Sequence, residues 1–496
     1  MYFLGIDLGS SSIKLSVLDA NKGAMIAGIA APDFEMEIAA PQFGWAEQDP
    51  VSWWNHIKEG LRALTTKQKL DLKKIRGIGI AYQMHGLVLT DKDLDPVRPS
   101  IIWCDSRAAE TGDRIYSQMG TNNCRLQILG SPGNFTASKL KWVQENEPEV
   151  FAKAAYMMLP GDYIASKFSK IPQTTASGLS EAALWNFGKN RLAVEVLQAM
   201  DLSKMLIPEI VPNFGKQARV HPEIAQELGL NPEAVITYRA GDQPNNALSL
   251  NVLEPGEIAT TAGTSAVIYA VTEKDLIDEQ NRVNTFLHVN SSREKKRNGV
   301  LLCINGSGIL YKWLRKIMST GHNELLSYEL LNSLAAKAPV GSEGLRFYPF
   351  GNGVERIFNN KAANSGIQNL NFNIHQASHL VRSACEGIVF AMNYGSEIMK
   401  EAGASGKIVR AGNANLFLSP VFREIFTNTT GATLEIYNSS GAEGAARGAA
   451  YGYGFFGDLQ EAMQGLKCLE RVEPNHELTG RYSEIYEHWK KNINIE

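Results

Sequence analysis

The chain has 496 residues, of which 44% are hydrophobic and 20% charged, and its formal net charge is -3. This length favours two domains of about 250 residues each, and the balanced charge argues against nucleic acid as a partner. The five cysteines include no CxxC pair, no apolar run is long enough to span a bilayer, and the start has no leader-like pattern. We therefore expect reduced thiols, no membrane partner and a cytoplasmic location.

The first expected element is a hairpin over residues 4–17. An apolar strand carries Asp7 and leads into a tight turn at Gly9, Ser10 and Ser11, and the return strand carries Lys14. Glycine lets the backbone approach an anion closely, and successive turn amides can donate to phosphate. A carboxylate beside such a turn suggests a cation, most simply hydrated Mg²⁺, although Asp7 could instead cap the turn.

A helix is predicted over residues 51–64, after Asp49 and Pro50, a pair typical of helix starts. Residues 75–91 indicate two apolar strands with a polar break, QMHG, at residues 83–86. The acidic string at residues 91–96 has proline where a calcium loop needs glycine, so we expect a turn there. The apolar stripe of the helix comprises Val51, Trp54, Ile57, Leu61 and Leu64.

The rest of the first half alternates strands and helices. A strand end near residue 100 carries Trp103 and Asp105 into a helix, and residues 137–146 form a further predicted helix. The segment from residue 161 to 250 ends where Asp242 marks the tip of a strand and the start of a helix. At such a position Asp242 could be either a helix cap or a catalytic base.

The second half opens with a hairpin, residues 259–271, that repeats the first layout. At one constant spacing Gly263 corresponds to Gly9 and Ser265 to Ser11, whereas Thr261 replaces Asp7. Glycine–serine turns are common between strands, but a matched pair indicates internal duplication. We expect two related α/β domains, residues 1–253 and 254–496, that hold a nucleotide from both sides.

Further elements continue this style. Residues 304–314 place a glycine turn at a helix start, which suits anions, and a long helix is expected over residues 376–402. A strand at residues 408–411 precedes a turn at residues 412–415, and the small residues 441–452 suit a helix pressed against backbone or a flat ligand. The GxGxxG match after this helix follows no strand, so we reject it, and the chain lacks a GxxxxGK[ST] loop.

Together these motifs resemble those of the FGGY family of carbohydrate kinases, in order along nearly the whole chain. The resemblance rests on the Asp7 hairpin, FTASKLKWVQEN at residues 135–146, the Asp242 strand tip, the Gly263 hairpin and HLVRSACEGIVF at residues 379–390. QMHG and WCDSR (residues 103–107) are most similar to members that phosphorylate xylulose. Members that phosphorylate glycerol carry an Arg-Glu pair at the position of QMHG. One departure is Gly-Asn-Ala-Asn at residues 412–415, where many relatives have a longer glycine-rich run.

The resemblance implies two duplicated RNase H/actin-like domains with the active site in the cleft between them. It implies ATP and Mg²⁺ as cofactors, a small sugar as substrate and a homodimer. Asp242 would accept the proton of the terminal sugar hydroxyl as the γ-phosphoryl group arrives. The implied sugar contacts are Gln83, Met84, His85, Trp103 and Asp105; the implied nucleotide contacts are Gly9, Ser10, Ser11, Lys14, Gly263, Thr264, Gly306, Gly412 and Asn415; and the implied metal ligand is Asp7.

Several alternatives remain open from the sequence. His85 could be a satisfied structural residue, and Trp103 and Asp105 could belong to the domain core. The leading hypothesis is phosphorylation of D-xylulose to D-xylulose 5-phosphate. Its nearest rival is a related kinase for another ketose, alditol or aldonate. Two alternatives belong to other classes of protein: an actin- or Hsp70-like ATPase, and a catalytically inactive sugar sensor. The presence of Asp242 argues against the inactive sensor.

Overall fold

The computed structural model describes residues 1–321 and 323–495. Its contacts divide the chain into two compact units. Unit 1 comprises Met1–Asn251, Phe286–Asn298 and Ser439–Leu466, and unit 2 comprises Val252–Thr285, Gly299–Asn438 and Lys467–Glu496. Two segments from the second half of the chain thus join unit 1, and the contiguous division at residues 253 and 254 stays a prediction.

Unit 1 is built on a six-stranded mixed sheet in the order β13-β14-β5-β1-β2-β3. β1 pairs antiparallel with β2 and parallel with β5, and β5 pairs parallel with β14. The predicted first hairpin and the strand before QMHG are therefore confirmed. The strands are β1 (Tyr2–Leu8), β2 (Ile13–Asp19), β3 (Ala24–Ala31), β5 (Ile75–Tyr82), β13 (Phe214–Arg219) and β14 (Val235–Gly241).

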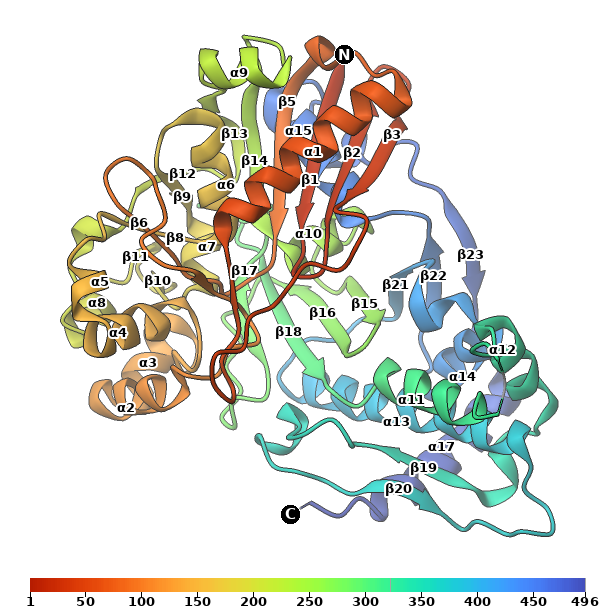
Figure 1. Ribbon diagram of the computed structural model, residues 1–496. Helices are drawn as coiled ribbons and strands as arrows, with labels where there is room; N and C mark the ends of the chain where they lie inside the picture. Colours follow the sequence, from red (N-terminus) through yellow and green to blue (C-terminus); the bar gives the residue numbers. More distant parts are fainter. Residues whose placement is uncertain (322, 496) are drawn as a thin grey trace. The chain divides into compact units, whose positions relative to one another are not determined.

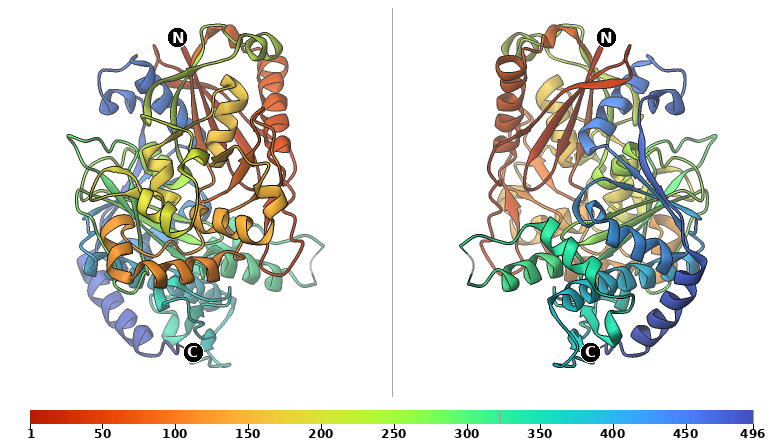
Figure 2. Two further views of the ribbon diagram at one scale, coloured as in Figure 1. Left: turned by 90° about the vertical axis from the view of Figure 1, so that its left-hand side faces the viewer. Right: turned by 90° about the vertical axis from the view of Figure 1, so that its right-hand side faces the viewer.

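Two helices cover opposite faces of this sheet, α1 (Pro50–Gln68) and α15 (Gly441–Tyr453), as Figures 1 and 2 show. On the α1 face, Leu15 fills the space where Gly60 lacks a side chain. On the α15 face, a Cβ at Gly5 would lie 1.9 Å from the backbone oxygen of Ala442. A Cβ at Gly452 of α15 would likewise lie 2.0 Å from the backbone oxygen of Thr237, so small residues on both sides permit contact between helix and strand backbones, as predicted.

The predicted stripe of α1 is correct except at its first position. Asp49 caps the helix by accepting from the backbone N–H of Val51. Val51 itself is 43% exposed, whereas Trp53 is fully buried. Because the helix begins at Pro50, Trp53 rather than Val51 faces the sheet in its first turn.

Further segments complete unit 1. The acidic string forms the predicted turn, in which the Asp91 carboxylate accepts from the backbone N–H groups of Asp93 and Asp95. The other helices are α2 (Ala109–Met119), α3 (Thr121–Ile128), α4 (Thr136–Asn146), α5 (Pro148–Phe151), α6 (Pro160–Ser169), α7 (Ala176–Glu181), α8 (Val194–Ala199), α9 (Pro222–Leu228), α10 (Asp242–Ser249) and α16 (Leu459–Ala462). Short strand pairs are formed by β4 (Glu47–Gln48) with β7 (Ser100–Ile101), β6 (Val88–Thr90) with β8 (Tyr156–Met158), β9 (Gln173–Thr175) with β12 (Glu209–Val211), and β10 (Trp185–Asn186) with β11 (Arg191–Leu192).

The second large sheet has seven strands in the order β17-β18-β16-β15-β21-β22-β23. β15 pairs antiparallel with β16 and parallel with β21, β21 pairs parallel with β22, and β22 pairs antiparallel with β23. The strands are β15 (Ile258–Ala262), β16 (Ala266–Thr272), β17 (Asn284–Leu287), β18 (Asn298–Ile304), β21 (Ile408–Gly412), β22 (Thr433–Tyr437) and β23 (Cys468–Val472).

The core of unit 2 surrounds the long helix α13 (Ala377–Glu401), which confirms the helix expected at residues 376–402. Its buried residues, among them Val381, Ile388 and Met392, pack with aromatic residues such as Trp489. The other elements are α11 (Gly308–Met318), α12 (Tyr328–Lys337), α14 (Pro420–Thr430), α17 (His476–Lys491), β19 (Arg346–Pro349) and β20 (Ser365–Gln368).

The two sheets repeat one topology. The order β3-β2-β1-β5-β14-β13 in unit 1 corresponds to β18-β16-β15-β21-β22-β23 in unit 2. In unit 1, β1 has the antiparallel β2 on one side and the parallel strands β5 and β14 on the other. In unit 2, β15 has the antiparallel β16 on one side and the parallel strands β21 and β22 on the other. The predicted duplication is confirmed. Among the described residues, no helix is both long and apolar enough to cross a membrane.

Candidate active site

Three parallel strands of unit 1 end at the same level of the sheet. Leu8 of β1 pairs with Tyr82 of β5, and Tyr82 also pairs with Gly241 of β14. The chain leaves these ends as the turn at Gly9, the QMHG break and the start of α10 at Asp242. The carboxyl ends of parallel strands form a common ligand-binding edge. The structure therefore brings three separate predicted motifs to one edge of unit 1.

Asp242 is the first residue of α10, and Gly241 is the N-cap, which disfavours a role for Asp242 as the cap. Burial and the negative charge of Asp7 raise the pKa of Asp242 to about 7. The pKa of Asp7 is also raised by burial, and Lys14, its partner across the hairpin, opposes this shift. A carboxylate that titrates near neutral pH can take a proton from an alcohol at physiological pH.

Asp7 also lies against the first residue of α15. A Cβ at Gly441 would come within 2.4 Å of an Asp7 carboxylate oxygen, so a side chain at this position would displace the carboxylate. The start of a helix stabilises negative charge. Within residues 1–321 and 323–495, no group of three or more His, Cys, Asp or Glu side chains could hold a metal ion. Mg²⁺ is commonly bound through one or two carboxylates and substrate phosphates, so Asp7 fits this ion without a protein cage.

The turn after β1 has the compact form expected of a phosphate-binding turn. The backbone N–H of Gly9 donates to the oxygen of Ser12 at 3.1 Å. Ser11 is exposed, Ser10 is half-buried, and Lys14 is exposed on β2. The side chains of Ser10, Ser11 and Lys14 are therefore at least partly accessible to a ligand.

A buried glutamine joins this turn to the QMHG break. The side-chain amide of Gln48 donates to the backbone oxygen of Ser10 at 2.7 Å, and its oxygen accepts from the Gln83 amide at 3.0 Å. Trp53 donates to the same Gln48 oxygen at 3.2 Å. Gln83 is 2% exposed, so its role here is to connect two segments of the edge.

Met84 and His85 lie beside the end of β14. A Cβ at Gly241 would come within 2.6 Å of the Met84 side chain. His85 has a φ of 60°, which is uncommon outside glycine, and its Nδ1 lies 2.9 Å from the Glu181 backbone oxygen. Because a carbonyl can only accept, we assign the proton to Nδ1, which makes Nε2 the acceptor in the neutral ring.

The His85 backbone and ring are both fixed. Lys139 is fully buried, and its Nζ donates to the backbone oxygens of His85 at 2.8 Å and Ile102 at 2.9 Å. Burial lowers the pKa of Lys139 to about 7. The His85 ring centroid lies 4.4 Å from that of Phe135 and 5.4 Å from that of Phe286.

The two remaining predicted sugar contacts differ in environment. Trp103 is 53% exposed and can meet a ligand. Asp105 is fully buried and accepts from the backbone N–H of Ala46 at 2.6 Å and from the Arg107 guanidinium at 2.7 Å. This environment favours the structural alternative for Asp105 over a sugar contact.

Unit 2 contains a cavity of about 510 Å³ beside the second hairpin. The backbone oxygen of Gly263 accepts from the N–H of Gly308 at 2.9 Å, which fixes the hairpin turn to the start of α11. Asn415 has a φ of 54° and places its amide beside Gly263. The lining is formed by Ala262, Gly263, Thr264, Gly308, Tyr311, Lys312, Tyr328, Glu329, Asn332, Asn415, Leu416 and Leu418.

Gly306 and Gly412, also predicted nucleotide contacts, do not line this cavity. The backbone N–H of Gly306 donates to the Glu355 carboxylate at 2.6 Å, and a Cβ there would lie 2.4 Å from the backbone oxygen of Pro349. Gly412 is the last residue of β21 and pairs with Tyr437. Gly306 is thus held by close backbone contacts, and Gly412 belongs to the sheet.

Sequence reasoning missed three residues near these sites, namely Gln48, Glu181 and Tyr311. Tyr311 could have been found, because it follows Gly308 by one helical turn at a predicted anion-binding helix start. Gln48 and Glu181 bond to residues 35 and 96 positions away in the chain, respectively. No local pattern could have signalled these two.

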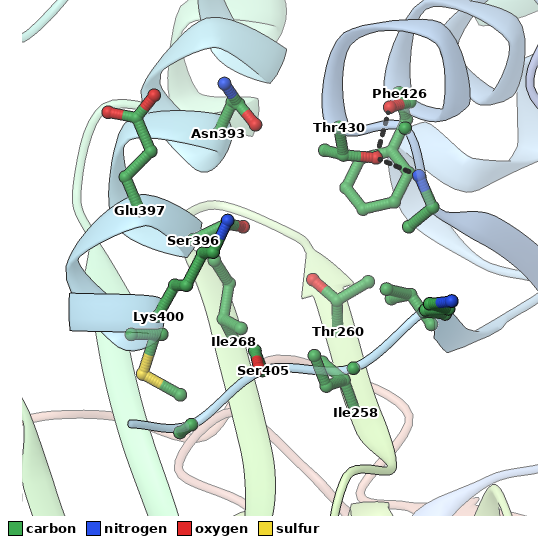
Figure 3. A pocket seen from close by; sticks show the side chains of 17 residues that line it. Ile258, Thr260, Ile268, Asn393, Ser396, Glu397, Lys400, Ser405, Phe426 and Thr430 are labelled. Carbon is green, nitrogen blue, oxygen red and sulfur yellow. Dashed lines mark hydrogen bonds between the residues drawn. The ribbon is translucent and has the colours of Figure 1, made fainter. Parts of the chain in front are cut away.

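A second cavity of unit 2, of about 550 Å³, is shown in Figure 3. It is lined by α13, α14 and the first residue of β15, Ile258, and on α14 the Thr430 hydroxyl donates to the Phe426 backbone oxygen at 2.7 Å. Gly263 follows the last residue of β15. This cavity therefore lies at the opposite end of the strand from the predicted nucleotide contacts.

A duplicated RNase H/actin-like frame with two carboxylates on one strand-end edge is typical of a nucleotide-dependent phosphotransferase. Two family models match the chain: the N-terminal domain of the FGGY family of carbohydrate kinases over residues 2–249, and its C-terminal domain over residues 258–453. The chain belongs to this family and is an ATP-dependent sugar kinase. The family match favours this class over an actin- or Hsp70-like ATPase.

Similar proteins include kinases for more than one sugar. The chain is 29% identical to the xylulose kinase of Klebsiella pneumoniae over 454 residues, which cover 90% of this chain and 88% of that protein. The structure of xylulose kinase from Rhodospirillum rubrum is similar with a TM-score of 0.87 at 20% identity, covering 99% and 98% of the two chains. The structure of gluconate kinase from Lactobacillus acidophilus gives 0.87 at 21% identity, covering 99% and 97%. The fold alone therefore does not select the sugar.

Proposed function

We propose that this protein transfers the γ-phosphoryl group of ATP to the terminal hydroxyl of D-xylulose, forming D-xylulose 5-phosphate. The observation that carries this proposal is the packing of Met84 on Gly241, directly beside Asp242. It supports a shared location for the predicted sugar contacts and the predicted base. The similarity to xylulose kinases over nearly the whole chain supports the choice of sugar.

In this proposal Asp242 accepts the proton of the attacking hydroxyl. Its raised pKa matches this role, because a base is most effective when its pKa is near the working pH. The half-buried His85 offers Nε2 to a sugar hydroxyl, and Met84 covers an apolar face of the sugar.

The nucleotide contacts are proposed in both hairpins. Gly9, Ser10, Ser11 and Lys14 would contact the phosphates from unit 1. Gly263, Thr264 and Asn415 line the unit 2 cavity that we assign to the nucleotide. Mg²⁺, when bound at Asp7, would neutralise charge on the β- and γ-phosphates.

A panel of sugars assayed by coupled ADP release tests the substrate. We expect the highest kcat/KM with D-xylulose, and NMR of the product should show phosphate on the terminal carbon. A clear preference for gluconate, ribulose or glycerol would contradict the proposal, and so would ADP release that is independent of any sugar.

Three further properties remain predictions. Ligand binding in a cleft between the two halves is expected from the family, and a crystal structure with D-xylulose and a non-hydrolysable ATP analogue would test it. A homodimer is also expected from the family and can be checked by light scattering after gel filtration. A cytoplasmic location is consistent with a need for ATP, and cell fractionation would test it.

A further inference from the structure

Glu181 is a buried acid that no motif singled out, and it lies at the end of β14. It is the last residue of α7 and is 2% exposed. A Cβ at Gly241 would lie 3.0 Å from a Glu181 carboxylate oxygen and 2.6 Å from the Met84 side chain. The carboxyl group therefore contacts the residue that immediately precedes Asp242, beside Met84.

Glu181 also holds His85. Its backbone oxygen accepts from His85 Nδ1 at 2.9 Å. The backbone N–H of His85 and the hydroxyl of Tyr82 lie close enough to the Glu181 carboxyl group to lower its pKa. Even so, neither carboxyl oxygen forms a full hydrogen bond within the part of the chain that the structure describes. Glu181 thus holds His85 and contacts the strand end that carries the base, and the Met84 side chain packs on the same glycine.

The helix that carries Glu181 is itself anchored at both ends. Thr175 caps α7 by accepting from the backbone N–H of Gly178 at 3.1 Å. Ser180, next to Glu181, accepts from the backbone N–H of Leu287 at 3.0 Å and donates to the Ser177 backbone oxygen at 2.7 Å. The position of Glu181 is therefore fixed by α7 and does not depend on the QMHG break.

The charge environment explains how an acid is tolerated at this position. Burial is the largest cause that raises the pKa of Glu181 well above its usual value, and the negative charges of Asp242 and Asp162 act in the same direction. A neutral carboxyl group can donate one hydrogen bond and accept others, as a glutamine side chain does. Burial of a polar group without a full partner is costly, so its presence at this edge calls for a role.

We propose that Glu181 is a positioning residue that holds the Met84–His85 turn against the strand end bearing Asp242, so that the sugar hydroxyl meets the base in a reactive geometry. This inference rests on the proposed sugar-kinase function. It goes beyond that function by assigning a role to a residue outside the predicted motifs. A leucine at position 181 would keep the volume but lose the polar contacts, whereas glutamine would keep both shape and polarity.

The test compares E181L and E181Q with the wild type in steady-state kinetics. We expect E181L to lower kcat/KM for the sugar about tenfold or more while leaving the KM for ATP within about twofold, because misplaced reacting groups cost rate steeply. We expect E181Q to stay within about threefold of the wild type, since polar shape rather than charge is needed. An E181L enzyme with wild-type kinetics would overturn the inference, as would an E181Q enzyme as impaired as E181L.

A matched control separates positioning from stability. Glu386 in unit 2 is also buried, but its carboxylate accepts from the backbone N–H of Gly341 at 2.8 Å and from the Ser342 hydroxyl at 3.0 Å, and it pairs with Arg382 at 3.2 Å. E386Q should therefore lower the melting temperature without changing the KM for the sugar. If E181L lost activity only in proportion to lost folded protein, as a purely structural residue would, the inference would be wrong.

A readout without catalysis keeps this test independent of the proposed function. The ¹³C-methyl NMR signal of Met84, assigned by M84L, should shift in E181L and remain near its wild-type position in E181Q. If the wild type phosphorylated no sugar in the panel, the proposed function would fail, yet the Met84 signal would still report on positioning. An unchanged Met84 signal in E181L would overturn the inference by itself.

Discussion

The two units share a sheet topology but differ in the charge at their strand ends. In unit 1, β1 carries Asp7 and β14 is followed by Asp242. In unit 2, the corresponding strand β15 carries Thr261, and β22 is followed by Asn438. Duplication has thus preserved the frame, while carboxylates occur at only one of the two sets of strand ends.

This difference suggests a division of labour between the units. Proton transfer and cation binding need carboxylates, and unit 1 has two of them at one edge of its sheet. At its strand-end side the cavity of unit 2 is bordered by neutral groups, namely the glycine turn at Gly263, Thr264 and the Asn415 amide, while the charged Lys312 and Glu329 line it from α11 and α12. Neutral donors can bind phosphate without the repulsion that additional carboxylates would cause.

The largest expected effect comes from removing the base. D242N should lower kcat about a hundredfold or more, because general-base catalysis typically contributes that much. Sugar affinity should change far less, since the base acts chiefly in the transition state. Steady-state kinetics and calorimetric titration with the sugar measure the two quantities. A D242N enzyme that kept more than about a tenth of the wild-type kcat would refute the assignment of the base.

The next effect compares Asp7 with its counterpart Thr261. D7N should lower kcat about tenfold or more and raise the Mg²⁺ concentration needed for half-maximal activity, because an anionic ligand is lost. T261V should stay within about threefold of the wild type, since no charge is removed. Equal losses of kcat in D7N and T261V would show that the difference in charge between the units does not affect catalysis.

The two carboxylates of unit 1, Asp7 and Asp242, predict a pH dependence with a definite sign. Asp242 must be deprotonated to accept a proton, so kcat/KM for the sugar should rise as pH increases through about 7. The negative charge of Asp7 raises the pKa of Asp242, and its removal in D7N should therefore move this rise to lower pH. T261V should leave the profile unchanged. A shift of the D7N profile to higher pH would contradict the electrostatic coupling of the two acids.

A smaller effect is expected on the sugar side of unit 1. H85A should raise the KM for the sugar about tenfold, because a site built to hydrogen-bond a hydroxyl loses that partner, while the KM for ATP stays unchanged. His56 on α1, whose ring Nδ1 pairs with Glu59 at 2.9 Å, provides a control, and H56A should leave both KM values unchanged. A rise in the KM for ATP alone in H85A would contradict the assignment of His85 to the sugar.

Local sequence patterns were sufficient to predict the frame and the charged strand ends. The hairpins and Asp242 depend on alternation of apolar residues, glycine turns and strand tips, all of which are encoded within a few residues. The assignment of α15 to unit 1 could not be predicted, because it depends on a contact between Gly5 and Ala442, far apart in the chain. The pairing of Asp105 with Arg107 is local, but only the burial of both side chains shows that it is structural.

The smallest expected effect concerns the cavity of unit 2. Tyr311 borders this cavity, donates its hydroxyl to the Asn332 side chain at 2.8 Å and stacks on Tyr328 with ring centroids 6.0 Å apart. Y311F removes only the hydroxyl, so the KM for ATP should rise by about two- to fivefold, the range expected for one neutral hydrogen bond. The KM for the sugar should not change, because Tyr311 belongs to the unit whose strand ends carry no carboxylate. A Y311F enzyme with an altered KM for the sugar and an unaltered KM for ATP would contradict the division of labour between the two units.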